Sequence, residues 1–270
     1  MTGPDRGAAG PAADCFNQLA QCRNGPMLYN RHDIYVGASL AKYGEFSPGE
    51  AALFAQLVGE GDLVVEVGAN IGAHTVGLSR LAGAGGIVIA FEPQRLVFQL
   101  LCANLALNGC ANVTVRQIAI GAAAGLAYVP VVAPDQPANF GGVSLYGNSE
   151  GERVALAALD DLGLPTCQFL KLDLEGMEVD ALLGATRLVA AFRPTIYVEN
   201  DRAEHGDALV GLLASWGYRM YWHRPPLFEP DNFAGDPENI FGPICSHNML
   251  CVPAERGLAA AEGMEAVVVG

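Results

Sequence analysis

The feature that most constrains the fold is a regular alternation between short apolar runs and helical stretches. Residues 62–67 are rich in β-branched side chains and too short for a helix, so they predict a buried strand, and a helical pattern follows at 73–81. Further strands are expected at 86–93, 112–120, 167–176, 193–201, 217–223 and 247–253, and further helices at 48–58, 94–107, 178–190 and 206–216. Strands separated by helices predict an α/β fold with a mostly parallel, doubly wound sheet.

Two parts of the chain depart from this alternation. The last two expected strands are joined by a Pro-rich loop and not by a helix, so they predict an antiparallel hairpin at the C-terminal edge of the sheet. Strand-like segments at 126–132 and 153–159 flank a turn-rich loop at 133–151, and they predict a small antiparallel excursion outside the main sheet.

We expect one domain, because 270 residues with 51% hydrophobic side chains are enough to bury a sizeable core. Residues 1–13 are expected to form a disordered leader. Residues 14–61 are expected to form a helical lead-in that packs on the core, because Ser47 and Pro48 announce a helix there. The core domain spans 62–254 with a loop insertion at about 125–158, and 255–270 form a C-terminal tail.

Charge and cysteine content exclude several classes of function. The net charge of −14 would repel a phosphate backbone, so we expect no nucleic-acid partner. The seven cysteines contain no C-x-x-C pair, which predicts a reducing compartment and no zinc site. The N-terminus lacks an apolar signal segment, and the uncharged run at 118–134 is broken by glycines and prolines. We therefore expect a cytoplasmic protein without a membrane partner.

The turn after the first core strand predicts a ligand site. A strand, a Gly-rich turn and a helix N-terminus expose backbone N–H groups at the carboxyl edge of a sheet, and Gly68 and Gly72 are expected to remove side chains where the ligand approaches. Their spacing differs from the G-x-G-x-x-G of dinucleotide folds, and Glu66 beside them would repel a pyrophosphate. A cationic ligand such as S-adenosylmethionine fits better.

Two further positions support the same ligand. Glu92 ends the second strand, where its carboxylate can accept both hydroxyl groups of a ribose, and Pro93 fixes the adjoining turn. Asn70 tolerates a strained turn and carries an amide that can bind a carboxylate or a hydroxyl. For Glu92 alone, an exposed residue in a turn is the simpler interpretation, and the Gly-rich turn one strand earlier shifts the balance toward a ligand.

Five segments together resemble the FkbM family of class I S-adenosylmethionine-dependent methyltransferases. They are EVGANIGAHTVGLSRLAG, AFEP, NLALNG, KLDLEGMEVDALLGA and RPTIYVEN, and the resemblance covers roughly 43–253. It implies a Rossmann-like sheet of seven strands, S-adenosylmethionine as the donor and S-adenosylhomocysteine as the product. It also implies methylation of a hydroxyl oxygen on a natural product, a sugar or a glycan-like acceptor, which would make the 62–254 domain a class I methyltransferase domain.

The strand at 167–176 carries the candidate catalytic residues. Period-two alternation places Lys171, Asp173 and Glu175 on one face of a strand that should be covered on both sides. Buried charges are costly unless paired, so this series favours a site, although a structural Lys–Asp pair that caps the next helix is the alternative. We expect Asp173 to touch the acceptor hydroxyl or the donor, with Lys171 and Glu199 orienting it and setting its charge.

Two alternatives to this assignment stay open. His247 opens the last strand and is the main rival to Asp173 as the base. Asp173, Glu175 and Glu199 could hold Mg²⁺ as in catechol-type methyltransferases, because hard cations take oxygen ligands. The sequence lacks a convincing Asp-Asn pair for that pattern, so a transfer without metal is favoured.

The remaining cofactor candidates come from three places. His74 and Thr75 lie in the first turn of the helix after the Gly-rich segment, where His74 would be a neutral hydrogen-bonding group or simply a partly exposed residue. The resemblance implies that Asn104 reaches the ribose. Gln117 and Ala119, at the end of the third strand, are expected at the adenine edge, or else are ordinary sheet residues.

The acceptor is expected to be a neutral hydroxylated small molecule. Asn139 and Ser144 lie in a long loop, and loops of that length in a compact domain are often functional. Trp222 and His223, with Tyr221, Phe228 and Phe233, could form an aromatic wall or could pack an edge hairpin. Alternatives are a cofactor-binding module without transfer, methylation of nitrogen or carbon, and a nicotinamide-dependent oxidoreductase, which the glycine spacing disfavours. Homo-oligomerisation stays open.

Overall fold

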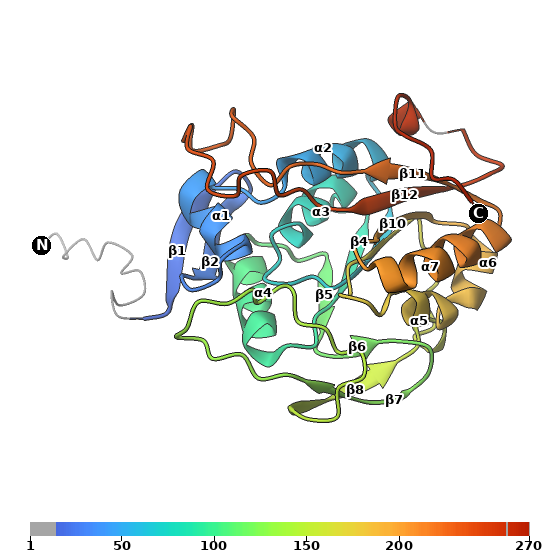
Figure 1. The fold of residues 1–270 in the computed structure, drawn as a ribbon, viewed down its shortest axis with the longest axis horizontal. Helices are drawn as coiled ribbons and strands as arrows, with labels where there is room; N and C mark the ends of the chain where they lie inside the picture. Colours follow the sequence, from blue (N-terminus) through green and yellow to red (C-terminus); the bar gives the residue numbers. More distant parts are fainter. Residues whose placement is uncertain (1–14, 258, 270) are drawn as a thin grey trace, which may run out of the picture.

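The computed structural model describes residues 15–257 and 259–269, and a seven-stranded sheet runs through its centre (Figure 1). The expected leader at 1–13 lies outside the described residues. The sheet order is β11-β12-β10-β9-β3-β4-β5. These strands are β3 (Leu63–Val67), β4 (Ile87–Phe91), β5 (Val113–Arg116), β9 (Phe169–Leu172), β10 (Thr195–Glu199), β11 (Tyr218–His223) and β12 (Asn248–Pro253).

The expected mostly parallel sheet with an antiparallel C-terminal edge is confirmed. Strands β10, β9, β3, β4 and β5 pair in parallel, so their carboxyl ends meet at one edge. Strand β12 lies between β10 and β11 and is antiparallel to both. No helix of the described residues is long and apolar enough to cross a membrane.

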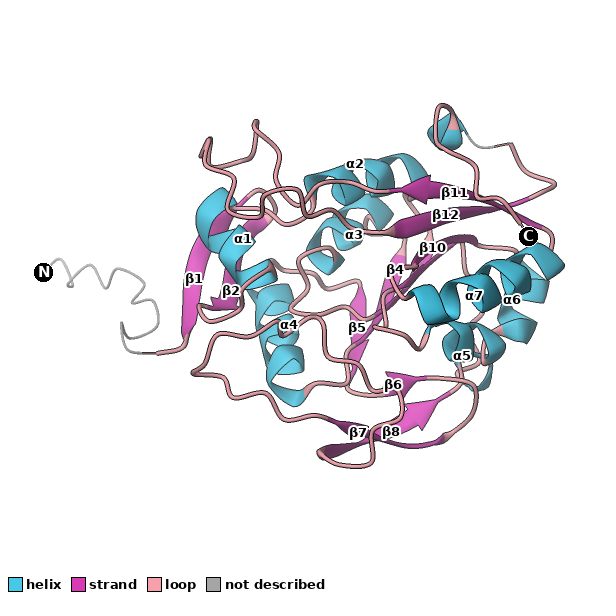
Figure 2. Cartoon of the chain, viewed as in Figure 1, coloured by secondary structure: helices cyan, strands magenta, loops and turns pink. Residues whose placement is uncertain are grey.

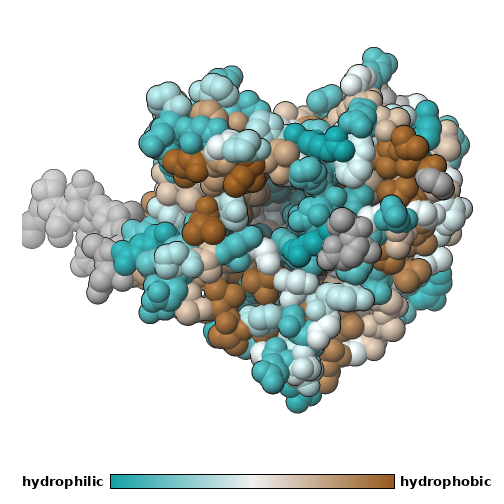
Figure 3. Space-filling view, viewed as in Figure 1, coloured by the Kyte–Doolittle hydropathy of each residue, from teal (hydrophilic) through white to brown (hydrophobic). Residues whose placement is uncertain are grey.

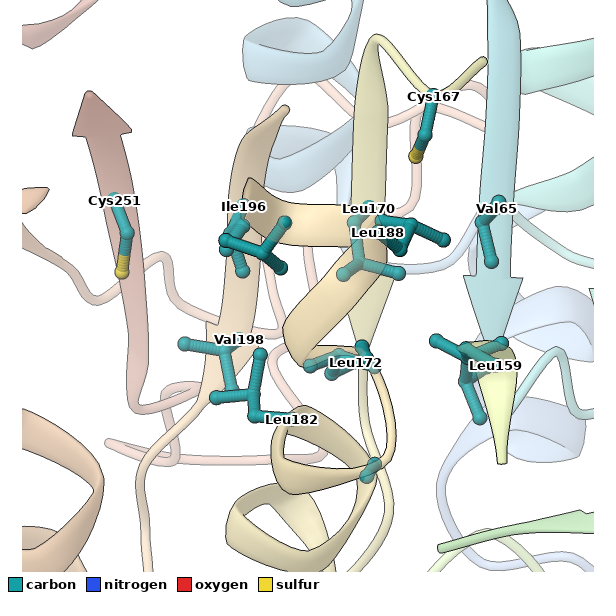
Figure 4. Close-up of a cluster of buried hydrophobic side chains, with 14 of the residues drawn as sticks. Val65, Leu159, Cys167, Leu170, Leu172, Leu182, Leu188, Ile196, Val198 and Cys251 are labelled. Atoms are coloured by element: carbon teal, nitrogen blue, oxygen red, sulfur yellow. The ribbon is translucent and has the colours of Figure 1, made fainter. Parts of the chain in front are cut away.

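Helices cover both faces of the sheet (Figure 2). They are α1 (Val36–Tyr43), α2 (Pro48–Leu57), α3 (Thr75–Ala82), α4 (Arg95–Leu107), α5 (Glu178–Leu183), α6 (Thr186–Phe192) and α7 (Ala203–Ser215). Figure 4 shows the core on one face, where Leu170, Leu172 and Val198 pack against Leu182 of α5 and Leu188 of α6. Their alternate neighbours on the same strands face α2 and α3, which is why these strands are apolar on both sides.

The N-terminal segment differs from the helical lead-in that we expected. It begins with an antiparallel hairpin of β1 (Asn17–Cys22) and β2 (Gly25–Asn30), which lies beside α1 and α4 (Figure 1), and only then forms α1 and α2. The hairpin turns at Arg23-Asn24, and Gly25 has a φ of 97°. Asn-Gly is a strong signal for a tight hairpin turn, so the local sequence already contained this feature.

The third expected strand is divided between two sheets. Its first part is β5 of the main sheet, and its second part is β6 (Ala119–Ile120) of a three-stranded sheet with order β6-β8-β7. The antiparallel pairing of β7 (Gly125–Val129) with β8 (Glu152–Ala157) is the excursion that we expected. The helix expected at 178–190 is likewise broken into α5 and α6 at Gly184, whose backbone packs against the carbonyl oxygen of Gly121.

The glycines after β3 allow close contacts within the protein itself, and their expected contact with a ligand stays a prediction. Gly68 has a φ of 79°, and a Cβ there would lie 1.8 Å from the carbonyl oxygen of Asp173. A Cβ on Gly72, whose φ is 86°, would lie 2.8 Å from Leu101 Cδ1. The turn after β3 and the end of β9 are therefore in direct backbone contact, and Gly68 is what allows it.

Gly68→Ala should destabilise the protein more than Gly61→Ala. Both glycines have a positive φ, but a Cβ on Gly61, whose φ is 91°, would meet nothing within 4 Å among the described residues. Gly61→Ala therefore costs only the conformational penalty of roughly 1–2 kcal/mol, while Gly68→Ala adds the clash with Asp173. The measurement is the free energy of unfolding in urea for both variants, and equal losses would contradict this account.

Candidate active site

A cavity of about 350 Å³ lies at the carboxyl ends of β3, β4, β9 and β10. A hollow with hydrophilic residues along much of its rim is visible in the space-filling view (Figure 3). Ligands in open α/β sheets bind at this edge, because loops from several strands converge there. The predicted site residues that line the cavity are Glu66, Gly68, Asn70, His74, Glu92, Pro93, Ala119, Asn139, Lys171, Asp173, Glu175 and Glu199.

The other predicted cofactor residues do not line the cavity, and each has a structural position instead. Asn104 is completely buried, and its amide bonds the backbone of Leu28 and Ile71, so it ties α4 to the hairpin. Thr75 is also completely buried and donates a hydrogen bond to Glu66. Gln117 is exposed between β5 and β6, and Gly72 packs on α4.

Four of the residues expected near the acceptor or the base also lie away from the cavity lining. Ser144 Oγ accepts a hydrogen bond from the Tyr146 N–H within its own loop. Trp222 packs at the edge of the core beneath Arg224, and His223 Nδ1 lies 2.8 Å from the hydroxyl of Tyr197. His247 is exposed, and its Nε2 lies 3.6 Å from Cys245 Sγ. The hairpin residues therefore form packing and edge contacts, which was the open alternative.

The cavity also contains side chains that the sequence did not predict. They come from the residue before α1, from the segment between α1 and α2, from α2, from the turn before α7, from the loop between β11 and β12, and from the start of β12: Tyr35, Phe46, Glu50, Asp201, Arg202, Leu227, Ile244, Ser246 and Asn248. An acidic residue is common in the first turn of a helix, and Glu50 occupies that position in α2. The sequence therefore did not indicate that Glu50 belongs to a site. Only the packing of α2 over the sheet brings it there.

A buried lysine lies in the floor of the cavity. Lys171 of β9 has only 2% of its side chain exposed and lies level with Glu66 of β3 and Tyr197 of β10 in the strand register. Its Nζ is 3.1 Å from Asp173 Oδ2. Burial alone would lower the pKa of Lys171, but Asp173, Glu66 and Glu50 outweigh it and raise that pKa above the usual value. These carboxylates therefore favour the cationic form of Lys171.

Glu50 connects the same floor to α2 and β12. Its Oε1 accepts a hydrogen bond of 3.0 Å from Asn248, and its Oε2 lies 3.3 Å from His74 Nε2. Burial would raise the pKa of Glu50, but His74 and Lys171 together lower it to about 2. His74 Nε2 is close to this carboxylate without the alignment of a hydrogen bond, and no other described residue bonds it.

Glu92 lies in the cavity lining directly after β4, which is two strands away from β9 in the sheet. Its Oε2 accepts the backbone N–H of Asn70 at 3.0 Å, and its Oε1 accepts that of Gln94 at 2.9 Å. The side chain is buried, and burial raises the pKa of Glu92 to about 7. Each oxygen keeps a further lone pair for a hydroxyl donor.

Three carboxylates gather where β9 and β10 end. Asp173, Glu175 and Glu199 each place an oxygen within 4.8 Å of the others. Glu175 forms an ion pair with Arg202, yet burial and the charge of Asp173 raise its pKa to about 7. Burial, Asp173 and Glu175 hold the pKa of Glu199 well above its usual value. The predicted convergence of these side chains is thus present in the structure.

Replacing Lys171 by Met should destabilise the protein by about 3–5 kcal/mol, because Asp173, Glu66 and Glu50 would lose a buried cation that faces all three. The free energy of unfolding in urea at pH 7 gives this loss. The control is Arg95→Met, which removes the exposed partner of Glu152 and should change stability little. A similar result for both variants would contradict the role of Lys171.

Comparison with known proteins supports the family resemblance. Residues 66–220 match the family described as the methyltransferase FkbM domain, which is more than half of the chain. A search of curated proteins returned no match.

Similar solved structures are methyltransferases from several bacteria. A methyltransferase FkbM from Methylobacillus flagellatus KT has 19% identity and a TM-score of 0.48 over 73% of this chain and 47% of that one, so this chain spans less than half of its length. A SAM-dependent O-methyltransferase from Thermotoga maritima has 14% identity and a TM-score of 0.45 over 78% and 66%. The O-methyltransferase TomG from Streptomyces achromogenes, solved with SAM, has 13% identity and a TM-score of 0.46 over 76% and 79%. With the match over 66–220, the chain belongs to the FkbM family of S-adenosylmethionine-dependent methyltransferases.

Proposed function

We propose that the protein transfers a methyl group from S-adenosylmethionine to a hydroxyl oxygen of a small molecule, such as a natural product, a sugar or a glycan-like acceptor. The observation that carries this proposal is one cavity that is lined by both Glu92 and the Lys171–Asp173 pair. Glu92 suits a ribose, and Asp173 offers a carboxylate to an acceptor hydroxyl.

The residues present fit the donor. The cavity volume lies within the usual range of small-molecule sites. Its lining contains seven carboxylates but only Lys171 and Arg202 as lysine or arginine cations, so it favours a ligand with a net positive charge. Those carboxylates are Glu50, Glu66, Glu92, Asp173, Glu175, Glu199 and Asp201. Near Glu92, the apolar side chains of Ile118 and Ala119 provide a surface suited to adenine.

The chain's contribution to the reaction is mainly positioning. When bound, the donor supplies an electrophilic methyl carbon on a sulfonium, and an in-line displacement requires only that the acceptor oxygen lie behind that carbon. The carboxylate of Glu92 would accept hydrogen bonds from the ribose hydroxyls of the donor and so hold it in the cavity. Asp173 accepts a hydrogen bond from the acceptor hydroxyl through its partly exposed carboxylate, and Lys171 holds that carboxylate in place.

The working environment that we propose is the cytoplasm. All seven cysteines are free, which supports a reducing compartment. The net charge of −14 supports a small-molecule acceptor in place of a nucleic acid.

Glu92→Gln should weaken binding of S-adenosylhomocysteine by roughly 10- to 100-fold, since a hydrogen bond to a charged group contributes about 1.5–3 kcal/mol. Because the pKa of Glu92 is about 7, the carboxylate that accepts both hydroxyls predominates only above that pH. Wild-type affinity should therefore rise from pH 6 to pH 8, and the variant should lose this dependence. Calorimetric titrations at both pH values measure the effect, and unchanged affinity in the variant would refute the ribose assignment.

Asp173→Asn should lower turnover by about 10²–10⁴-fold while leaving affinity for S-adenosylhomocysteine within a few-fold, because a lost proton acceptor affects the transfer step. The measurement is transfer from labelled S-adenosylmethionine to a panel of polyols, phenols and glycosides. His247→Gln is the matched control for the rival base, and its exposed position outside the cavity lining predicts nearly full turnover. Full turnover in Asp173→Asn with loss in His247→Gln would reverse the assignment.

A further inference from the structure

We propose that Asp173, Glu175 and Glu199 form a binding site for one divalent cation of the magnesium type, beside the position of the acceptor. Asp173 and Glu175 directly follow β9, and Glu199 ends β10. The two strands are parallel neighbours with Val198 opposite Leu172, so their carboxyl ends bring the three side chains to one point of the cavity wall. An oxygen from each lies within 4.8 Å of an oxygen from the other two.

A buried carboxylate oxygen without a hydrogen-bond partner supports a ligand at this group. Glu199 Oε2 is buried and has no hydrogen-bond partner among residues 15–257 and 259–269. A buried carboxylate oxygen without a donor or a cation is costly, and such atoms in folded proteins usually have a partner.

The two lysine or arginine cations of the cavity lining, Lys171 and Arg202, form their ion pairs with carboxylates other than Glu199. Lys171 contacts Asp173 only through Oδ2, and Arg202 contacts Glu175 only through Oε2. The same Arg202 also approaches Asp201 at 3.2 Å. Within the described part of the chain, Glu199 forms no ion pair. Asp173 Oδ1, Glu175 Oε1 and the Glu199 carboxylate therefore remain as acceptors for a further positive charge.

The chemistry of the donors favours a hard divalent cation. All three are carboxylates, which Mg²⁺ and Ca²⁺ bind at roughly 2.0–2.6 Å. Two oxygens bound to one ion lie at most about twice the bond length apart, roughly 4.2 Å for Mg²⁺ and roughly 5.2 Å for Ca²⁺. The three oxygens lie within 4.8 Å of one another, so they can surround an ion of the size of Ca²⁺ as they stand, and Mg²⁺ requires a small inward movement of the side chains. Mg²⁺ in particular keeps water and substrate oxygens in its coordination shell, and the cavity supplies room for them.

The sequence favoured transfer without metal because it contains no convincing Asp-Asn pair. The structure changes that weighing, because the carboxylate of Glu199 reaches the group from the neighbouring strand. A residue 26 positions away in the chain from Asp173 thus supplies the third oxygen.

The role of the cation rests on the proposed function. An acceptor hydroxyl that coordinated the ion would have a lowered pKa and would give its proton to Asp173, the proton acceptor of the proposed function. A lone pair of that oxygen forms the new C–O bond, and the electron pair of the broken C–S bond stays on sulfur. The cation changes neither its charge nor its oxidation state.

The test is binding of Mn²⁺ to the full chain without cofactor, followed by electron paramagnetic resonance, with Mg²⁺ as a competitor. Wild-type protein should bind one Mn²⁺ saturably, and Glu199→Gln should weaken binding at least tenfold. Asp201→Asn is the matched control, since it removes a carboxylate from the same cavity outside the group and should change affinity less than threefold. The thermal unfolding midpoint of Glu199→Gln should not fall, because the change keeps the shape of the side chain and removes no hydrogen bond from Oε2, which has no partner among the described residues.

Two results would overturn the inference: no saturable Mn²⁺ binding in wild type at millimolar concentrations, or equal binding by Glu199→Gln. Methyl transfer at full rate after removal of metal with EDTA would overturn the role of the cation and leave the proposed function intact. Mn²⁺ binding that depends on Glu199, in a protein that transfers no methyl group to any acceptor, would support the cation site and count against the proposed function.

Discussion

The buried ammonium of Lys171 fixes the relative positions of three elements of the site. It faces Glu66 on β3, Asp173 after β9 and Glu50 on α2, and a buried cation is stable only while such partners stay in place. The ion pair with Asp173 orients the carboxylate that we place beside the acceptor. The attraction of Glu50 draws α2 over the carboxyl edge of the sheet, and that helix then forms part of the cavity wall.

The carboxylates of the cavity lining differ in their electrostatic surroundings. Glu92 is held by two backbone N–H groups, so its carboxylate is preorganised without a cation. Where β9 and β10 end, Asp173, Glu175 and Glu199 repel one another. Lys171 pairs with Asp173 and Arg202 pairs with Glu175. Such crowding costs stability, and proteins concentrate costs of this kind at functional sites. The same crowding makes this group receptive to a positively charged ligand.

The strands and helices of the main sheet could be predicted from the sequence, because the apolar patterns that indicate them lie within short stretches of adjacent residues. Strands covered on both faces give continuous apolar runs, as at β3 and β9, and helices give a longer period. The errors have specific causes: the Asn24-Gly25 turn signal was overlooked at the N-terminal hairpin, and one apolar run was shared between β5 and β6 of different sheets. Gly68 lines the cavity, and its backbone also lies against that of Asp173, a contact between distant residues that local sequence does not predict.

The sequence by itself determined the order of strands and helices, the family, and the placement of Glu66, Glu92 and Asp173 at strand ends, because periodicity and motifs are properties of adjacent residues. Only the tertiary structure decided which distant side chains meet. Asn248 bonds Glu50 across 198 residues, and Glu199 joins Asp173 because β10 lies beside β9. The structure also shows that Asn104 and His223 lie outside the cavity lining, where Asn104 bonds the backbone of Ile71 and His223 contacts the hydroxyl of Tyr197. Such contacts depend on strand order and on helix packing, which no local pattern encodes.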